Sequence, residues 1–232
     1  QRLARTLLDQ CVHEDEGPLP FVVAALEQSA GRGREGRGWW SPAGSGLYAS
    51  LVIPVSSNQR LQELPIRVAA ALASFVSVVV RGDCRIKWPN DLVVGRRKLG
   101  GILVDAVSPP SPADSWAIVG FGLNYATPDT AVLEGATSVL EEAGGSGAAP
   151  PPFARFVAAA ISVVWRPVAR DEPAWVETFS VLSAHRAGDP IRFRLDGEVV
   201  ERRFGGFDAH GFLRLETDSG MRLVRSGEVF SW

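Results

Sequence analysis

A glycine- and arginine-rich segment, GRGREGRG, occupies residues 31–38 between two apolar stretches. Glycines let backbone N–H groups turn toward an anion, and arginines supply planar donors that match carboxylate and phosphate oxygens. A disordered linker or an RNA-binding tract has a similar composition, but this segment is short, internal and followed by Trp39 and Trp40. We therefore expect an ordered loop that binds an anion.

A second charged segment, KWPND at residues 87–91, is followed by Lys98 seven residues after Asp91. The Asp91 carboxylate suits Mg²⁺, which takes few protein ligands and several phosphate oxygens. The residues between Asp91 and Lys98 have the length of a hairpin, so the two side chains are expected to flank one pocket. A capped surface turn is the alternative, because Pro-Asn-Asp is common turn chemistry.

Lys87 and Lys98 are the only lysines among 24 basic residues, and both lie within twelve positions. Codon usage and chance are the simplest explanation of this count, which by itself assigns neither lysine a role. An ammonium group nevertheless differs from a guanidinium, because it is a compact charge and not a rigid fork. The motifs around the two lysines must therefore decide what they do.

The third segment, GFGLN at residues 120–124, has glycines at alternate positions. In a strand this spacing removes the side chains from one face, so that a planar ring can lie against the backbone. Tight packing of a helix on the sheet would use the same spacing. The segment alone does not separate these two explanations.

Composition narrows the class of protein. The chain has 232 residues, 46% of them hydrophobic and 22% charged, with a net charge of −2, which is typical of a globular protein and gives no bulk attraction to nucleic acid. Its two cysteines and three histidines are scattered, so neither zinc nor haem is expected. We also find no run of about 18 apolar residues and expect no membrane span and a cytoplasmic location.

Hydrophobic spacing predicts the elements that position the motifs. We expect strands at 21–27, 47–55, 86–88, 98–107 and 116–125, and helices at 2–10, 61–80, 153–168 and 175–183. Residues 31–46 are expected to form a loop and residues 141–152, EEAGGSGAAPPP, a linker. From Gly188 onward, short alternating runs separated by glycine-containing turns indicate a small antiparallel barrel. The expected division is an α/β body over residues 1–185 and a β module over residues 186–232.

Together these segments resemble the biotin–protein ligases. The resemblance rests on four segments in the family's order, which are EQSAGRGREGRGW (27–39), KWPNDLVVGRRKLGGILVD (87–105), GFGLN (120–124) and SGEVF (226–230). It extends over nearly the whole chain and implies an α/β (α+β) fold. In that fold a mixed β-sheet with flanking helices forms the catalytic domain, and a small SH3-like β-barrel follows it.

The resemblance also implies a two-step reaction. Biotin and MgATP give biotinoyl-5′-AMP and pyrophosphate, and the biotinoyl group then passes to one lysine of a biotin carboxyl carrier domain. The partners are therefore biotin, ATP with Mg²⁺ and a carrier protein, and a homodimer is compatible with the family. The reaction needs cations, because the biotin carboxylate and the α-phosphate of ATP repel each other.

Site residues follow from the family's motifs by position. Biotin or its adenylate would contact Gln28, Arg32, Gly33, Arg34, Trp39, Lys98 and Gly101, with Arg34 and Lys98 as the catalytic residues. The nucleotide would contact Arg37, Gly120, Gly122 and Asn124, and Asp91 would hold Mg²⁺. The resemblance gives no role to Lys87.

Two features depart from the family's pattern. A Ser-Thr-Asn segment that contacts biotin in the family would end near Gln1, and no residues are available for an N-terminal helix-turn-helix, so we expect the form without a repressor role.

Two alternatives stay open. One is a lipoate or octanoate ligase or transferase of the same fold, and the other is a nucleic-acid-binding module without catalysis.

Overall fold

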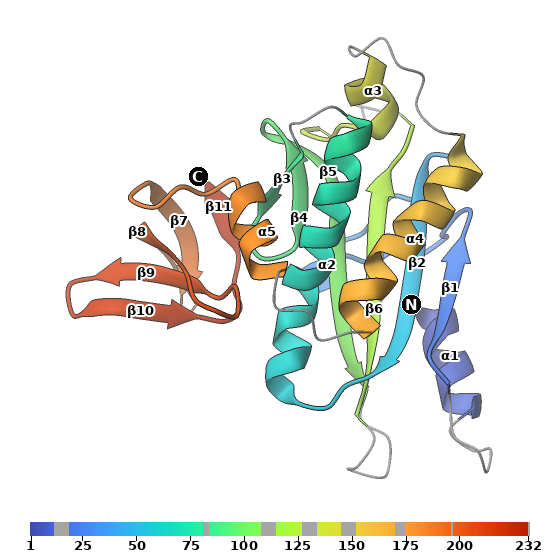
Figure 1. Ribbon diagram of the computed structural model, residues 1–232, viewed down its shortest axis with the longest axis horizontal. Coiled ribbons are helices and arrows are strands. Elements are labelled where there is room, and N and C mark those ends of the chain that lie inside the picture. Colours follow the sequence, from blue (N-terminus) through green and yellow to red (C-terminus); the bar gives the residue numbers. More distant parts are fainter. Residues whose placement is uncertain are drawn as a thin grey trace.

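The computed structural model describes residues 1–11, 19–80, 84–107, 115–126, 134–144, 152–169, 175–195 and 197–231. Two β-sheets and the helices that cover the larger one make up these residues (Figure 1). The larger sheet contains β1 (Phe21–Ala25), β2 (Gly46–Pro54), β3 (Cys84–Lys87), β4 (Asp91–Val94), β5 (Arg97–Val107) and β6 (Trp116–Asn124). The expected fold class is confirmed.

Strand order in the larger sheet is β1-β2-β6-β5-β4-β3, and all five neighbouring pairs are antiparallel. We expected a mixed sheet, but the larger sheet is antiparallel throughout. The only parallel pairs in the described chain are two isolated bridges, Ile86 with Ser183 and Lys98 with Ala136. The reason is the connectivity. Strands β3 to β6 follow one another in the chain and pair in that order, and short connections join antiparallel neighbours only.

Helices cover the two faces of this sheet unequally. On one face, α2 (Asn58–Val79) packs with α4 (Phe153–Ala169) and α5 (Trp175–Leu182) over the main hydrophobic core (Figure 1). On the other face, α1 (Arg2–Cys11) is the only one of the described helices that packs, and it places Ala4 and Leu8 in a small apolar cluster at one end of the strands. The rest of that second face is left open for the site described below.

Helix α2 begins three residues before its expected start, because Ser57 caps it by accepting a hydrogen bond from the Arg60 backbone N–H. Its length and apolar composition would suffice to cross a membrane, but 56% of its most apolar window is buried inside the protein. This packing identifies α2 as a core helix.

Two local elements differ from expectation. Strand β4 (Asp91–Val94) was not among the expected strands, although its residues lie in the predicted hairpin between Asp91 and Lys98. Helix α3 (Val139–Gly144) occupies the beginning of the predicted linker at 141–152, where Ser138 Oγ accepts a hydrogen bond from the Glu141 backbone N–H. Residues 145–151 of that linker lie outside the described residues.

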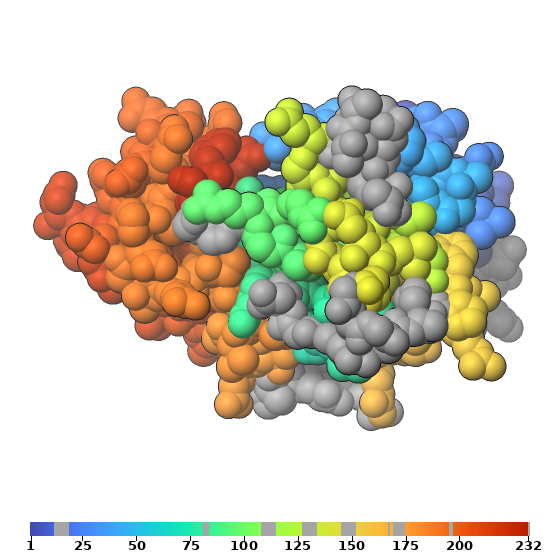
Figure 2. All heavy atoms as spheres, turned by 90° about the horizontal axis from the view of Figure 1, so that it is seen from above, coloured from blue at the N-terminus to red at the C-terminus, as the bar shows by residue number. Residues whose placement is uncertain are grey.

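The C-terminal sheet has the order β10-β9-β8-β7-β11 and forms the β-rich, SH3-like module (Figure 1). It contains β7 (Pro190–Leu195), β8 (Glu198–Phe207), β9 (Leu213–Thr217), β10 (Gly220–Val224) and β11 (Val229–Ser231). The module packs directly beside the strands that carry KWPND (Figure 2). There the Trp88 indole N–H donates a 3.1 Å hydrogen bond to the Gly211 carbonyl, and the Trp88 ring lies 6.0 Å from that of Phe193. The domain boundary at 185/186 stays a prediction, close to the start of β7.

Candidate active site

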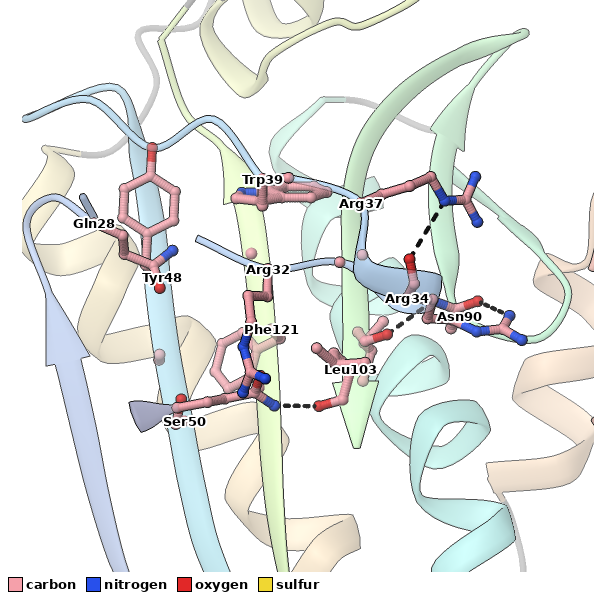
Figure 3. Close-up of a pocket in the computed structure, with 18 of the residues that line it drawn as sticks. Gln28, Arg32, Arg34, Arg37, Trp39, Tyr48, Ser50, Asn90, Leu103 and Phe121 are labelled. Atoms are coloured by element: carbon pink, nitrogen blue, oxygen red, sulfur yellow. Dashed lines mark hydrogen bonds between the residues drawn. The ribbon is translucent and has the colours of Figure 1, made fainter. Parts of the chain in front are cut away.

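The open face of the larger sheet holds a cavity of about 550 Å³. This volume is in the range of pockets that bind small molecules, which is about 300–1,000 Å³. Five parts of the chain line it, namely the start of α1, the larger sheet, the loop at 27–39, the turn between β3 and β4, and residues 228–229 of the C-terminal module. Figure 3 shows Trp39 and Arg32 of the loop across this space from Ser50 of β2 and Leu103 of β5.

Strand register explains the cavity floor. One row of directly paired residues crosses all six strands of the sheet, in the order Ala25, Tyr48, Gly122, Gly101, Asp91 and Lys87. A second row on the same face consists of Val23, Ser50, Gly120 and Leu103. All ten residues line the cavity. The glycines at the centre of both rows make the floor flat, which agrees with the prediction that a ring can lie against GFGLN.

The glycine- and arginine-rich loop forms the opposite wall of the cavity. It is ordered by the Gly33 backbone N–H, which donates to the Arg37 carbonyl at 2.7 Å, and by a bridge between Arg32 and Gly38. The Trp39 ring lies over Gly122, where an added Cβ would come within 2.9 Å of the indole. Figure 3 shows this ring on the side of the cavity opposite Ser50 and Leu103. The expected ordered loop is therefore present.

The guanidinium group of Arg34 is held at one end of the cavity. Arg34 Nη1 donates to Asn90 Oδ1 at 2.9 Å (Figure 3). Its Nη2 donates to the Gly227 carbonyl at 2.8 Å. Asn90 is itself fixed, because its Nδ2 donates to the Ile102 carbonyl at 2.8 Å. The KWPND turn and the C-terminal module thus orient Arg34 together.

Two further ion pairs lie at the same end. Lys98 Nζ is 2.8 Å from Asp91 Oδ1 and 5.3 Å from the centre of the Trp39 ring. Arg37 Nη2 is 2.6 Å from Glu228 Oε1 of the C-terminal module. The hairpin predicted from the spacing of Asp91 and Lys98 therefore brings both side chains to one cavity, as expected.

The cavity carries an excess of positive charge. Six of its lining residues are basic, namely Arg2, Arg32, Arg34, Arg37, Lys87 and Lys98, and three are acidic, namely Glu27, Asp91 and Glu228. Burial lowers the pKa of Lys87, whereas the negative charge of nearby Asp91 raises it by a smaller amount. The buried indole N–H of Trp39 has no hydrogen-bond acceptor within the described part of the chain. The excess positive charge and the unpaired indole N–H both favour a ligand with several anionic oxygens.

Eleven of the twelve site residues expected from the resemblance line this cavity, and Asn124 does not. The eleven are Gln28, Arg32, Gly33, Arg34, Arg37, Trp39, Asp91, Lys98, Gly101, Gly120 and Gly122. Asn124 Nδ2 donates instead to the Thr137 carbonyl at 3.0 Å and reaches the Lys98 carbonyl at 3.4 Å. In this structure Asn124 supports the strand that carries Lys98, and its contact with a nucleotide stays a prediction.

Sequence reasoning missed three kinds of lining residue. Tyr48 and Ser50 lie in a strand that is otherwise apolar, so they were not identified as site residues. Their spacing of two residues was the available signal, because it places both side chains on the same face of the sheet. Leu103 contributes its carbonyl, which accepts a 2.9 Å hydrogen bond from Gln1 Nε2 (Figure 3). Glu228 lies 191 positions from its partner Arg37, and no local pattern links such distant residues.

Asp91 is the residue expected to hold a metal ion. The described residues contain no group of three or more His, Cys, Asp or Glu side chains that would hold one unaided. The Asp91 side chain is 20% exposed and faces the cavity beside Lys98. A single accessible carboxylate fits Mg²⁺ that arrives with phosphate oxygens as its other ligands.

Comparisons with known proteins agree with this geometry. The model of the biotin/lipoate A/B protein ligase family matches residues 1–124, and that of the biotin protein ligase C-terminal domain matches residues 188–232. A biotin–[acetyl-CoA-carboxylase] ligase of Paracoccus denitrificans is 32% identical over 222 residues, which cover 90% of this chain and 89% of the relative.

Solved structures show the same fold. A biotin protein ligase from Aquifex aeolicus in complex with biotin and ATP superposes with a TM-score of 0.72 at 21% identity, covering 90% of this chain and 87% of that one. A biotin protein ligase from Leishmania major in complex with biotinyl-5-AMP gives a TM-score of 0.62 at 22% identity, covering 100% and 94%. With its catalytic sheet, its cavity and both of its matched regions, the chain belongs to the biotin/lipoate A/B protein ligase family, in the branch of the biotin–protein ligases.

Proposed function

We propose that this protein is a cytoplasmic, ATP-dependent biotin–protein ligase that forms AMP. The observation that carries the proposal is the convergence of the glycine- and arginine-rich loop, Asp91 and Lys98 on one cavity with a flat floor and excess positive charge. Such a cavity accommodates a small ring system next to groups that neutralise a carboxylate and phosphates. The free thiols Cys11 and Cys84 agree with a reducing compartment.

In the first step, a carboxylate oxygen of biotin attacks the α-phosphorus of ATP. The bond from that phosphorus to the oxygen bridging to the β-phosphate breaks, and pyrophosphate leaves. Lys98 and Arg34 lie where they would neutralise the two anions that must approach each other, and the contacts of Arg34 with Asn90 and Gly227 keep its guanidinium in place. The residues act by charge and position, so no proton transfer is required of them.

Mg²⁺ enters as part of the MgATP substrate, in which it screens the phosphate charge. Asp91 is the carboxylate that would contact it. In the structure, Asp91 forms an ion pair with Lys98. We infer that MgATP replaces this pair, so that Asp91 turns to the ion and Lys98 to the reacting oxygens.

In the second step, the amine of a carrier lysine attacks the acyl carbon of the adenylate, and AMP leaves. The wall that contains Trp39 shields this mixed anhydride from water until the carrier arrives. The carrier is a biotin carboxyl carrier domain of a carboxylase, in keeping with the similarity to the biotin–[acetyl-CoA-carboxylase] ligase of Paracoccus denitrificans. Formation of a homodimer stays a prediction, which sedimentation of the protein with and without biotin would test.

Biotin-dependent exchange of labelled pyrophosphate into ATP tests the proposal. We expect exchange with biotin, and little or none when lipoate or octanoate replaces it. Exchange with lipoate alone would favour the alternative enzyme of the same family. A folded protein that exchanges with none of these acids, but is retained on single-stranded nucleic acid at physiological salt, would contradict a ligase function altogether.

A further inference from the structure

Lys87 is the one lysine to which neither the motifs nor the proposed mechanism gives a role. It is the last residue of β3, and its neighbours Ile86 and Trp88 point into the hydrophobic core. Because successive side chains of a strand point to opposite faces, Lys87 points to the cavity, which it lines. Its side chain is therefore within reach of a ligand in the cavity.

The floor row of the cavity gives Lys87 a defined place along the ligand. From the sheet centre outward, the row runs from Gly101 to Asp91 and then to Lys87. Lys98 Nζ lies at the Asp91 position, and Lys87 follows one strand further out, a step of about 4.8 Å. A nucleotide whose α-phosphate lies at Lys98 can therefore extend its remaining phosphates toward Lys87.

The charges around Lys87 favour such an anion. Lys98 and Arg37 lie near Lys87, as do the carboxylates of Asp91 and Glu228, so three cations share two carboxylates in this part of the cavity. Burial is the main reason that the pKa of Lys87 is lowered, and the neighbouring cations add to this effect. A bound polyanion would offset both effects by its negative charge and stabilise the ammonium form.

We propose that Lys87 binds the β- and γ-phosphates of ATP and retains them until they leave as pyrophosphate. This inference rests on the proposed function and deepens it by assigning the leaving group a subsite. Arg37 of the glycine- and arginine-rich loop also lies near Lys87 in this subsite, where it donates a hydrogen bond to Glu228 of the C-terminal module. Lys98 acts at the reacting atoms, whereas Lys87 acts only while the pyrophosphate moiety is present.

The two half-reactions separate this role from a structural one. Adenylation involves the triphosphate, whereas transfer from purified biotinoyl-AMP to the carrier does not. For Lys87→Met we expect the KM for MgATP in pyrophosphate exchange to rise about 10- to 100-fold, which is the range for losing a charge-assisted hydrogen bond. Transfer from biotinoyl-AMP should proceed at the wild-type rate, and Lys87→Arg should recover most of the ATP affinity.

Arg85→Met is the matched control. Arg85 lies two residues earlier on the same strand, does not line the cavity, and donates to the Val181 carbonyl. This variant should keep wild-type kinetics in both half-reactions. An unchanged KM for MgATP in Lys87→Met would overturn the inference, and so would an equal loss in both half-reactions, because that pattern indicates a general disturbance of the site.

Direct binding keeps this test independent of the identity of the acid substrate. Titration calorimetry of the full chain with magnesium pyrophosphate should show about tenfold weaker binding for Lys87→Met than for the wild type. If the wild type shows no biotin-dependent exchange, the proposed function fails, while a difference in pyrophosphate affinity still supports the subsite. If exchange occurs but the two proteins bind pyrophosphate equally, only the role of Lys87 fails.

Discussion

Lys98 reaches Asp91 because strand β5 contains a β-bulge next to Lys98. Gly100 pairs with Leu92 of β4, but the next residue of β4, Val93, pairs with Lys98, so that Leu99 is the extra residue. Leu99 is fully buried in the core, and a Cβ on Gly100 would also meet core side chains. Two successive positions therefore face the core, which returns Lys98 to the cavity face, where its Nζ lies 2.8 Å from Asp91 Oδ1. Bulges are known to re-aim side chains in this way beside active sites.

Replacing Lys98 with alanine should abolish most of the adenylation activity with little effect on folding. The charge acts on the reacting carboxylate and phosphate, so we expect kcat for pyrophosphate exchange to fall about 10²- to 10³-fold. The Lys98 side chain is 41% exposed, so the free energy of unfolding should change by less than about 1 kcal/mol. Exchange kinetics and urea unfolding measure the two effects, and a wild-type exchange rate would remove Lys98 from the mechanism.

Gly122→Ala should displace the tryptophan that covers the cavity. The new methyl group would lie 2.9 Å from the Trp39 ring, which is closer than carbon atoms normally approach. We expect the affinity for biotin to fall about tenfold, in keeping with overpacking costs of about 1–3 kcal/mol. Gly144→Ala is the control, because a Cβ there meets nothing within 4 Å. Calorimetry showing equal affinity in the wild type and Gly122→Ala would contradict the proposed contact.

Stability should depend on pH through His185. This side chain is 5% exposed, its Nε2 accepts a hydrogen bond from the Trp88 backbone N–H, and burial lowers its pKa to about 4. Between about pH 4 and 6.5 the unfolded chain therefore binds a proton that the folded chain does not. The free energy of unfolding should fall as the pH decreases from 6.5 toward 4, by up to about 3 kcal/mol.

Urea unfolding at several pH values checks this prediction. His185→Gln removes the titrating group, so its stability should fall less steeply over the same pH range. Carboxylates that titrate there remain in both proteins and cancel in the comparison. Identical slopes for the wild type and the variant would show that His185 does not carry the effect.

Trp88→Phe should loosen the contact between the larger sheet and the C-terminal module. The substitution removes the indole N–H that donates to the buried Gly211 carbonyl. An unsatisfied carbonyl and the lost volume should together lower the free energy of unfolding by about 2 kcal/mol or more. Trp40→Phe is the control, since Trp40 is 38% exposed and should change stability by no more than about 0.5 kcal/mol. Equal stabilities of the two variants in chemical denaturation would count against this role of Trp88.

The sequence by itself determined the fold class, the two-part organisation into helices with a large sheet and a β module, and most of the site. These features depend on local properties, namely hydrophobic spacing, turn residues and motif order, which a single segment carries. The segment 31–38, the pair Asp91 and Lys98, and the glycines of GFGLN were all identified in this way, and all line one cavity.

Only the tertiary structure decided how the site is completed. Strand register brings Lys87 into the floor row, the bulge at Leu99 turns Lys98 toward the cavity, and packing of the C-terminal module brings Gly227 and Glu228 to the arginine loop. Asn124 shows the opposite outcome, because it lies next to the site but supports the backbone. Each of these results depends on which distant segments pair and pack, and no stretch of sequence specifies that alone.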